Sequence, residues 1–444
     1  MNFHLITFGC QMNKADSETI AGLLKEAGHT PTVKPSHAEL LIFNSCCVRE
    51  HAENRLYGTI QTLKSLKRRK PDLIVALGGC VAEKERVRIL ERFPQVDLVF
   101  GTNNFHNLPR LIENYLQNPV PTCDTNGDAP FPENLPSLRR DRHRAWVPII
   151  RGCDNFCTYC IVPYVRGREN SRKMADILEE VRYLVDDGVR EITLLGQNVN
   201  SYGNDLGKGD YFAELLKALD EVEDLRRLRF ITSHPKDLSQ ATIDAVANSS
   251  RICEHFHLPL QSGSNRILSA MNRRYTQEKY LKLIAAIRRA IPKASITTDL
   301  IVGFPGEREE HFDETLKTVE QIRFDQAFTF LYSPRPGTAA ARREDDVTKE
   351  TKQARFDRLV ALQNGISLKK NKEEIGETLE VFVEGKSRRD PNILAGRTRT
   401  NKVVNFSGSE DLLNTFVDVR IVGAGTFSLK GTLCGEIAGK PEDT

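Results

Sequence analysis

The most constraining feature of this sequence is the alternation of short apolar runs with helical segments. Near the start of the chain, apolar runs predict strands at 4–8, 39–43 and 73–77, and the stretches between them have the apolar spacing of helices. Strands that are apolar throughout and alternate with helices are typical of a parallel sheet covered on both faces. The sequence therefore predicts an α/β domain over residues 1–120.

A cysteine follows each of these predicted strands. Cys10, Cys46 and Cys80 are 36 and 34 residues apart, about the length of one strand–helix unit. Parallel strands end at one edge of a sheet, and ligands bind beyond that edge. One cysteine there is ordinarily a small buried residue. Three in register predict thiolates that converge on a common site.

Residues 145–372 repeat the alternation and predict a second α/β domain. The expected strands lie at 146–150, 191–195, 228–231, 255–260, 296–302 and 326–332. Six strand–helix units predict a partial (β/α)6 barrel, with its chemistry at the carboxyl ends of the strands. Residues 121–144, rich in proline and polar side chains, are expected to form a linker between the two domains.

A second group of cysteines follows the first strand of this series. Cys153, Cys157 and Cys160 have C-x3-C-x2-C spacing, and a loop this short can direct three thiolates to one soft metal centre. Three ligands leave one coordination position open for chemistry, as catalytic zinc sites do. A zinc site would need a fourth ligand, but the first histidine downstream is His234. The spacing therefore favours an iron–sulfur cluster.

The remaining features concern the C-terminal region and the composition. Five short predicted strands over residues 373–440 indicate a small OB-like β-barrel. Six basic residues in it could follow RNA phosphates, the alternative being a solvated surface: Lys386, Arg388, Arg389, Arg397, Arg399 and Lys402. Cys123 and Cys253 have no partner at ligand spacing, and Cys434 is expected in the barrel core.

The composition is that of an ordinary globular protein. Of 444 residues 39% are hydrophobic and 28% charged, and the net charge of +3 says little about partners. The sequence has neither the pattern of a signal peptide nor an apolar run long enough to span a membrane. Ten cysteines in such a chain indicate reduced thiols and metal binding. We expect a cytoplasmic protein without membrane association.

Several motifs resemble those of one family. RGCDNFCTYC and IVPYVRGRENSR, together with ITFGCQMN, FNSCCVRE and GGCVAE, resemble the radical S-adenosylmethionine (SAM) methylthiotransferases. GRTRTNKVVNF resembles the TRAM domain, an RNA-binding module of the tRNA-modifying branch. The resemblance implies two 4Fe–4S clusters. Cys10, Cys46 and Cys80 would hold the auxiliary cluster, while Cys153, Cys157 and Cys160 would hold the cluster whose open iron binds SAM. Cys47 departs from the family pattern and leaves open which of the adjacent cysteines is the ligand.

The resemblance also implies the remaining parts of the site. Loops at the strand ends would place Gln197, Ser233, Gln261 and Gly303 against SAM, and no side chain is expected to act as an acid, base or nucleophile. The expected reaction adds a methylthio group to C2 of N6-isopentenyladenosine at tRNA position 37. The expected partners are the tRNA anticodon stem-loop, a reductant such as flavodoxin or ferredoxin, and an unassigned sulfur donor, with the protein a monomer.

Other functions remain open on the sequence alone. Related enzymes modify threonylcarbamoyladenosine in tRNA or an aspartate of a ribosomal protein with the same machinery. The TFGCQMN motif and the basic barrel favour the isopentenyl branch. A non-catalytic iron–sulfur protein that binds RNA, or an electron carrier with two clusters, would cleave no SAM.

Overall fold

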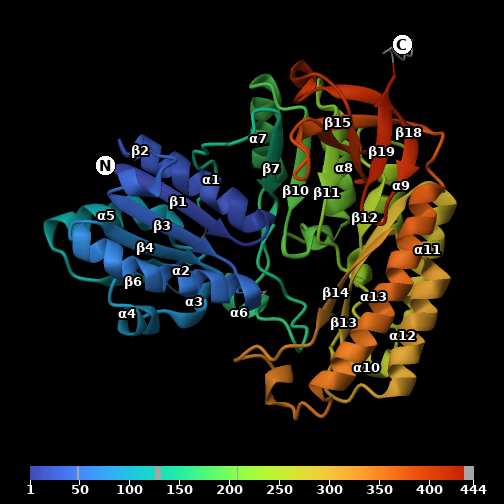
Figure 1. The fold of residues 1–444 in the computed structure, drawn as a ribbon, viewed down its shortest axis with the longest axis horizontal. Helices are drawn as coiled ribbons and strands as arrows, with labels where there is room; N and C mark the ends of the chain where they lie inside the picture. The colour runs from blue at the N-terminus through green and yellow to red at the C-terminus, as the bar shows by residue number, and fades with distance from the viewer. Residues whose placement is uncertain (48–49, 126–131, 208, 435–444) are drawn as a thin grey trace, which may run out of the picture. The chain divides into compact units, whose positions relative to one another are not determined.

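The computed structural model describes residues 1–47, 50–125, 132–207 and 209–434. The chain forms two compact units (Figure 1). The first contains Met1–Phe156, Cys160–Tyr211 and Val222–Leu225, and the second contains Cys157–Tyr159, Phe212–Glu221 and the chain from Arg226 onward. In the part of the chain that is described, none of the helices has both the length and the apolar character needed to cross a membrane.

The first unit is built on a six-stranded sheet with strand order β2-β1-β3-β4-β5-β6. All its neighbouring strands pair in parallel. The strands are β1 (Asn2–Phe8), β2 (Thr30–Pro31), β3 (Leu40–Ser45), β4 (Ile74–Gly79), β5 (Leu98–Phe100) and β6 (Thr122–Asp124). The helices are α1 (Gln11–Glu26), α2 (Glu50–Arg69), α3 (Cys80–Glu85), α4 (Arg88–Arg92) and α5 (Leu108–Gln117). The predicted parallel α/β sheet is confirmed.

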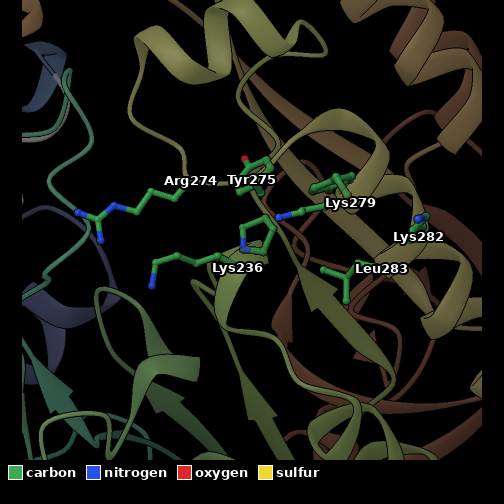
Figure 2. A pocket seen from close by; sticks show the side chains of 8 residues that line it. Lys236, Arg274, Tyr275, Lys279, Lys282 and Leu283 are labelled. Carbon is green, nitrogen blue, oxygen red and sulfur yellow. The ribbon is translucent and has the colours of Figure 1, made fainter.

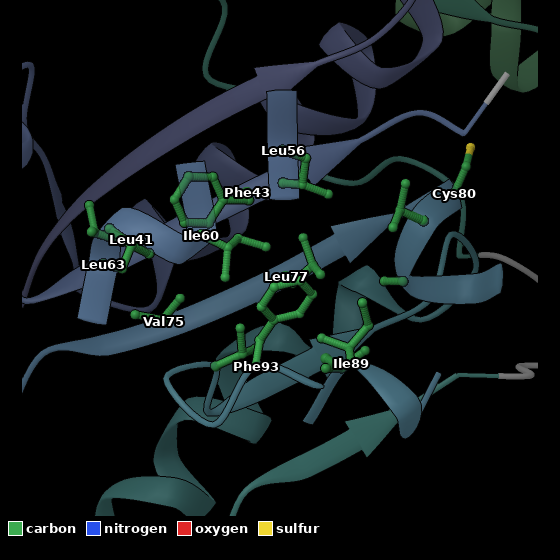
Figure 3. Packing of buried hydrophobic residues seen from close by; sticks show 14 of the residues in the cluster. Leu41, Phe43, Leu56, Ile60, Leu63, Val75, Leu77, Cys80, Ile89 and Phe93 are labelled. Carbon is green, nitrogen blue, oxygen red and sulfur yellow. The ribbon is translucent and has the colours of Figure 1, made fainter. Parts of the chain in front are cut away.

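Alternate residues of the central strands pack into two apolar layers. On one face, Phe43 of β3 and Leu77 of β4 belong to the same buried cluster as Leu56 and Ile60 of α2 (Figure 3). On the other face, the side chains that meet α1 and α5 include Phe3, Leu5, Ile42 and Ala76. Burial on both faces explains why these strands are apolar throughout. Packing on both faces holds the sheet in place and thereby positions the edge where β1, β3 and β4 end.

Three strands of this sheet were not predicted, and one of them, β2, has only two residues. β5 and β6 are short, and their apolar runs are too brief to give a clear strand signal. β6 lies within 121–144, the stretch expected to be a linker, and pairs with β5. The N-terminal sheet therefore continues beyond residue 120.

The first unit also contains the strands on either side of the cysteine loop. β7 (Arg144–Pro148) pairs in parallel with β10 (Glu191–Leu195), and the short strands β8 (Ile150–Arg151) and β9 (Asn170–Ser171) pair antiparallel. The helices are α6 (Val162–Arg166) and α7 (Met174–Asp186). The chain's single tryptophan, Trp146, lies on β7, with the Lys14 ammonium 5.4 Å from its ring centre.

The second unit contains the remaining predicted core strands. β12 (His255–His257), β13 (Ser295–Val302) and β14 (Gln326–Leu331) pair in parallel, and β11 is Arg227–Phe230. The helices are α8 (Tyr211–Asp220), α9 (Gln240–Ala247), α10 (Asn265–Ala270), α11 (Gln277–Ala290), α12 (Glu309–Ile322) and α13 (Lys349–Lys372). α13 runs along β14 and α12 (Figure 1). Each of the six predicted strands of the core is present as β7 or as β10 to β14.

Five further strands close into a barrel with strand order β15-β16-β17-β19-β18. They are β15 (Thr378–Lys386), β16 (Leu394–Thr398), β17 (Val403–Phe406), β18 (Phe416–Ala424) and β19 (Leu429–Leu433). Val381, Val404, Val419 and Leu429 form part of its buried core. The predicted OB-like barrel is confirmed. The prediction for Cys434 was wrong, since β19 ends one residue earlier and the cysteine is exposed.

Buried arginines attach this barrel to the rest of the second unit. Arg227 of β11 is fully buried and donates to the Glu380 carboxylate at 2.8 Å and to the Arg397 carbonyl at 2.8 Å. Arg229 donates to the Thr398 and Arg399 carbonyls at 2.7 and 2.9 Å. The barrel and the end of β11 are therefore held together by charged hydrogen bonds.

Candidate thiolate and ligand sites

Four thiols meet at the carboxyl edge of the N-terminal sheet. Cys46, Cys47 and Cys80 are buried, and Cys10 is exposed. Hydrogen bonding from Cys46 lowers the pKa of the Cys10 thiol to about 7. Hydrogen bonds from Cys46 and then Cys47 hold the pKa of Cys80 well below its usual range. The two donors have raised pKa values, Cys46 chiefly through its bond to Cys10 and Cys47 chiefly through its bond to Cys80. The edge therefore favours thiolates at Cys10 and Cys80.

A buried arginine supplies the positive charge that these thiolates need. The charge of Arg166, at the end of α6, contributes to lowering the pKa of both Cys10 and Cys80. Its Nη2 donates to the Asp16 carboxylate at 2.8 Å, and Arg151 Nη1 reaches the other oxygen of that carboxylate at 3.2 Å. Sequence analysis did not single out Arg166. The sequence feature that could have identified it is its position in the IVPYVRGRENSR motif.

Two asparagines and a glycine connect the strand ends that carry the cysteines. Asn13 Nδ2 donates to Asn44 Oδ1 at 3.2 Å, and Asn44 Nδ2 donates to the Asn13 carbonyl at 2.8 Å. Gly79, just before Cys80, has φ +88°, and a Cβ there would collide with the Asn44 side chain. Only glycine fits this position. Figure 3 shows the Cys80 sulfur pointing away from the packed apolar side chains.

The thiol set has the donors that an iron–sulfur cluster uses. Among the residues that the structure describes, no three cysteine, histidine or carboxylate side chains are arranged around one metal ion. A four-iron cluster binds each cysteine through a different iron, so its ligands face a common space without meeting at a point. Cysteine thiolates are the donors that hold iron–sulfur clusters.

The second cysteine group lies in a loop that contributes residues to both compact units. In the first unit Cys153 is buried and accepts a hydrogen bond from Asn155 Nδ2 at 3.4 Å. Gly152 has φ +76° and no room for a side chain against the Arg168 carbonyl. In the second unit, the buried Arg273 donates from Nη1 to Cys157 Sγ at 3.3 Å. Cys160 is half-buried. Cys153 and Cys157 thus each accept a hydrogen bond from a neighbouring side chain.

The residues expected to contact SAM differ in their surroundings. In the first unit, Gln197 Oε1 accepts the Gly152 N–H at 2.6 Å, so this side chain holds the cysteine loop. In the second unit, Gly303 has φ +74°, and its N–H donates to Glu307 Oε1 at 3.0 Å. Among the described residues, the buried Ser233 Oγ and Gln261 Oε1 have no hydrogen-bond partner.

Other buried polar atoms in the second unit share this condition among the described residues, including Ser264 Oγ, the Tyr332 hydroxyl and Gln363 Oε1. Sequence analysis did not select any of these three residues. Buried polar atoms cost free energy unless they are satisfied, so each one calls for a partner that the chain does not supply. A polar ligand such as SAM fits this requirement.

The basic residues of the barrel are mostly engaged within the chain. Arg399 pairs with Glu254 at 2.7 Å, and Lys402 pairs with Glu374 at 3.0 Å. Lys386 and Arg397 also have acidic partners. Arg388 and Arg389 are exposed and make no ion pair among the described residues. These two arginines, between β15 and β16, are therefore accessible to RNA phosphates, as are the exposed Arg420 and Lys430.

Sequence profiles of three families match consecutive parts of the chain. The Radical SAM superfamily matches residues 147–319, the uncharacterized protein family UPF0004 matches 2–101, and the TRAM domain matches 372–434. Together with the fold and the two cysteine groups, these matches define a radical SAM protein with an N-terminal α/β domain and a TRAM barrel.

Curated relatives match nearly the whole chain. The tRNA-2-methylthio-N(6)-dimethylallyladenosine synthase of Carboxydothermus hydrogenoformans is 52% identical over 97% of this chain and 99% of the relative. The protein of the same name from Acetivibrio thermocellus is 50% identical over 97% and 90%. The chain belongs to this family of radical SAM methylthiotransferases. Membership implies SAM and a 4Fe–4S cluster.

Solved structures share the fold at low sequence identity. The radical SAM methyltransferase TsrM from Kitasatospora setae has a TM-score of 0.57 at 13% identity, covering 77% of this chain and 75% of that protein. The cobalamin-dependent SAM radical enzyme OxsB has a TM-score of 0.54 at 13% identity, covering 82% and 56%. At this identity the likeness concerns the fold alone.

Proposed function

We propose that this protein adds a methylthio group to C2 of N6-isopentenyladenosine at position 37 of tRNA. The observation that carries the proposal is the 52% identity, over nearly the full length of both chains, to a synthase named for that reaction. The gathering of Cys10, Cys46 and Cys80 at one sheet edge supports it. The TRAM barrel supports tRNA as the substrate.

The ligand assignment is part of the proposal. Cys10, Cys46 and Cys80 would hold an auxiliary 4Fe–4S cluster, and Cys153, Cys157 and Cys160 a second one that also binds SAM. When bound, the second cluster and SAM supply a carbon-centred radical that can take hydrogen from an unactivated aromatic C–H bond. The division into residues 1–120, 145–372 and 373–440, with a linker at 121–144, remains a prediction.

The chain's own groups would orient and stabilise these cofactors. Arg166 and Arg273 would offset the negative charge of the thiolates in the two sites, because each guanidinium is buried beside a cysteine. Ser233 and Gln261, whose polar atoms are buried, would bind SAM together with Gly303, while Gln197 would position the cysteine loop. A flavodoxin or ferredoxin would supply electrons, the sulfur donor is unassigned, and the protein would act as a monomer.

Nucleoside analysis tests the reaction directly. Reconstituted protein is incubated anaerobically with SAM, reductant and isopentenylated tRNA, and digested tRNA is examined by mass spectrometry. We expect methylthio-isopentenyladenosine. SAM cleavage without this product would favour threonylcarbamoyladenosine as the substrate base. Absence of 5′-deoxyadenosine with both clusters intact would leave a non-catalytic RNA-binding protein.

Iron content tests the ligand assignment. Replacing Cys153, Cys157 and Cys160 with alanine should remove about half of the iron and all SAM cleavage, because SAM binds only that cluster. The exposed Cys434 provides a control, since C434A should keep all the iron. Unchanged iron in the triple variant would contradict the assignment.

A further inference from the structure

A basic pocket of about 380 Å³ lies in the second unit between the short helix η4 (Pro235–Asp237) and α11 (Figure 2). Figure 2 shows Lys236 and Arg274 extending toward one side of the pocket, with Lys282 and Leu283 on the other. Its lining comprises Pro235, Lys236, Arg274, Tyr275, Lys279, Tyr280, Lys282 and Leu283. Four of these side chains are cationic and none is acidic, so the pocket concentrates positive charge.

Most of this charge is not used inside the protein. Lys236 Nζ lies 2.5 and 2.7 Å from the carboxylate oxygens of Asp237. Arg274, Lys279 and Lys282 are exposed and have no ion pair among the described residues. Glu278 lies one turn before Lys282, but its oxygens accept hydrogen bonds from Asn265 at 3.0 and 3.2 Å. An anion would therefore find three cations without an ion pair among the described residues, of which Lys282 is attracted to Glu278.

Two of the cations occupy backbone positions that are unfavourable for a long, positively charged side chain. Arg274 has φ +51°, a left-handed backbone conformation that is unfavourable for a long side chain. Lys279 is in the first turn of α11, whose N-cap is Thr276. A cation there opposes the helix dipole. Residues that break local preferences without an evident structural gain are expected at functional sites.

The floor of the pocket is apolar. Tyr275 and Tyr280 are buried, and their hydroxyls donate inward to backbone carbonyls, that of Tyr280 to Leu258 at 2.8 Å. Ring and aliphatic surface is thus left toward the pocket, alongside Pro235 and Leu283. A basic rim over aromatic and aliphatic surface is how proteins bind single-stranded nucleic acid, with the rim on phosphates.

Arg273 connects the pocket to the cysteine loop of the second unit through hydrogen bonds. Arg273, the neighbour of Arg274, donates from Nε to the Tyr275 hydroxyl at 3.0 Å and from Nη1 to Cys157 at 3.3 Å. Ser233 precedes Pro235 by two residues. An RNA segment held in the pocket would therefore lie close to the candidate SAM site.

We propose that this pocket binds the phosphodiester backbone of the substrate RNA within a few nucleotides of the base that reacts. The inference rests on the proposed function for its ligand, and it assigns RNA contacts outside the TRAM barrel. It accounts for the surplus of positive charge, the apolar floor and the hydrogen-bond connection to Cys157.

RNA binding at several salt concentrations tests the proposal. The reconstituted protein is titrated into a labelled anticodon stem-loop RNA and binding is followed by fluorescence anisotropy. The variants are K236A/R274A and K279A/K282A. The control is R289A/K317A, which removes two exposed cations without an ion pair from α11 and α12. Iron content and circular dichroism check that each variant is folded.

Each pocket variant should bind RNA about tenfold more weakly in low salt, and the slope of log affinity against log salt should fall by about 1. The control should stay within about twofold of the wild type in affinity. Pocket variants with wild-type affinity and slope would overturn the inference, even if the wild type modifies tRNA. Inorganic phosphate binding by the same variants is a second readout. Pocket variants that lose phosphate binding but keep wild-type RNA affinity would also overturn the inference, because the pocket would then be a site for small anions. A wild type that binds no RNA would instead refute the proposed function.

Discussion

Replacing Arg227 with methionine should loosen the barrel, whereas replacing its neighbour Arg226 should not. Both arginines pair with Glu380 and lie over the Phe416 ring. Their environments differ, because the Arg227 side chain is 0% exposed and that of Arg226 is 56% exposed. Methionine retains most of the aliphatic volume, so the comparison isolates the guanidinium.

The expected loss follows from the bonds that Arg227 makes. It donates to the Glu380 carbonyl at 2.9 Å and to the Arg397 carbonyl at 2.8 Å, besides the Glu380 carboxylate. Breaking a buried pair by removing one partner costs about 3–5 kcal/mol. Because the Glu380 side chain is 32% exposed and can regain water, we expect the lower end of that range, about 3 kcal/mol. R226M should cost less than about 1 kcal/mol.

Hydrogen exchange is the suitable assay, because Trp146 lies in the first unit and tryptophan fluorescence would not report on the barrel. A cost of about 3 kcal/mol should speed exchange in β15 and β18 by about a hundredfold in R227M. R226M should change it by less than about fivefold. Equal effects of the two substitutions would refute the argument that burial makes Arg227 the attachment point.

Three further outcomes are expected. C46A should remove about half of the iron and C47A little of it, because Cys46 contacts the thiols of both other strand ends, whereas the thiol contact of Cys47 is with Cys80. Equal losses of iron in the two variants would contradict this difference. G79A should reduce both iron content and melting temperature, because alanine there is strained and its Cβ collides with the Asn44 side chain. G188A, at φ +95° with open space around it, should lower only the melting temperature. Metal analysis and calorimetry measure the two effects. Burial holds the pKa of His255 well below its usual value. Below about pH 6.5 the unfolded chain therefore binds a proton at this histidine that the folded chain excludes. As the pH falls below that value, the free energy of unfolding should decrease by up to about 1.4 kcal/mol per pH unit. Denaturation at pH 7.5 and 5.5 should show H255Q losing less stability than the wild type, and parallel losses would contradict the assignment.

The sequence predicted the elements that have a strong periodic signal. β10 was expected at 191–195 and is found there, and the strands that end before Cys10, Cys46 and Cys80 lie in register. These features follow from local patterns, because buried parallel strands are apolar throughout and their carboxyl ends meet at one edge.

Features that depend on contacts distant in sequence were not predicted. Arg166 is separated by 150 residues from its partner Asp16, so its role at the thiols has no local pattern. Arg399 and Lys402 were interpreted as possible phosphate ligands, yet their partners are acidic groups of the same chain. Charge counts reveal cations, but only packing reveals which of them are already paired.

The outer strands of the six-stranded sheet have a consequence for the protein before its metal is inserted. β2 has two residues, one of them Pro31, and β6 has three residues and follows Pro119 and Pro121. Proline lacks the N–H that a new neighbour would need, and such short strands offer little length for pairing. Before its clusters are assembled, the chain should therefore resist aggregation through the edges of this sheet.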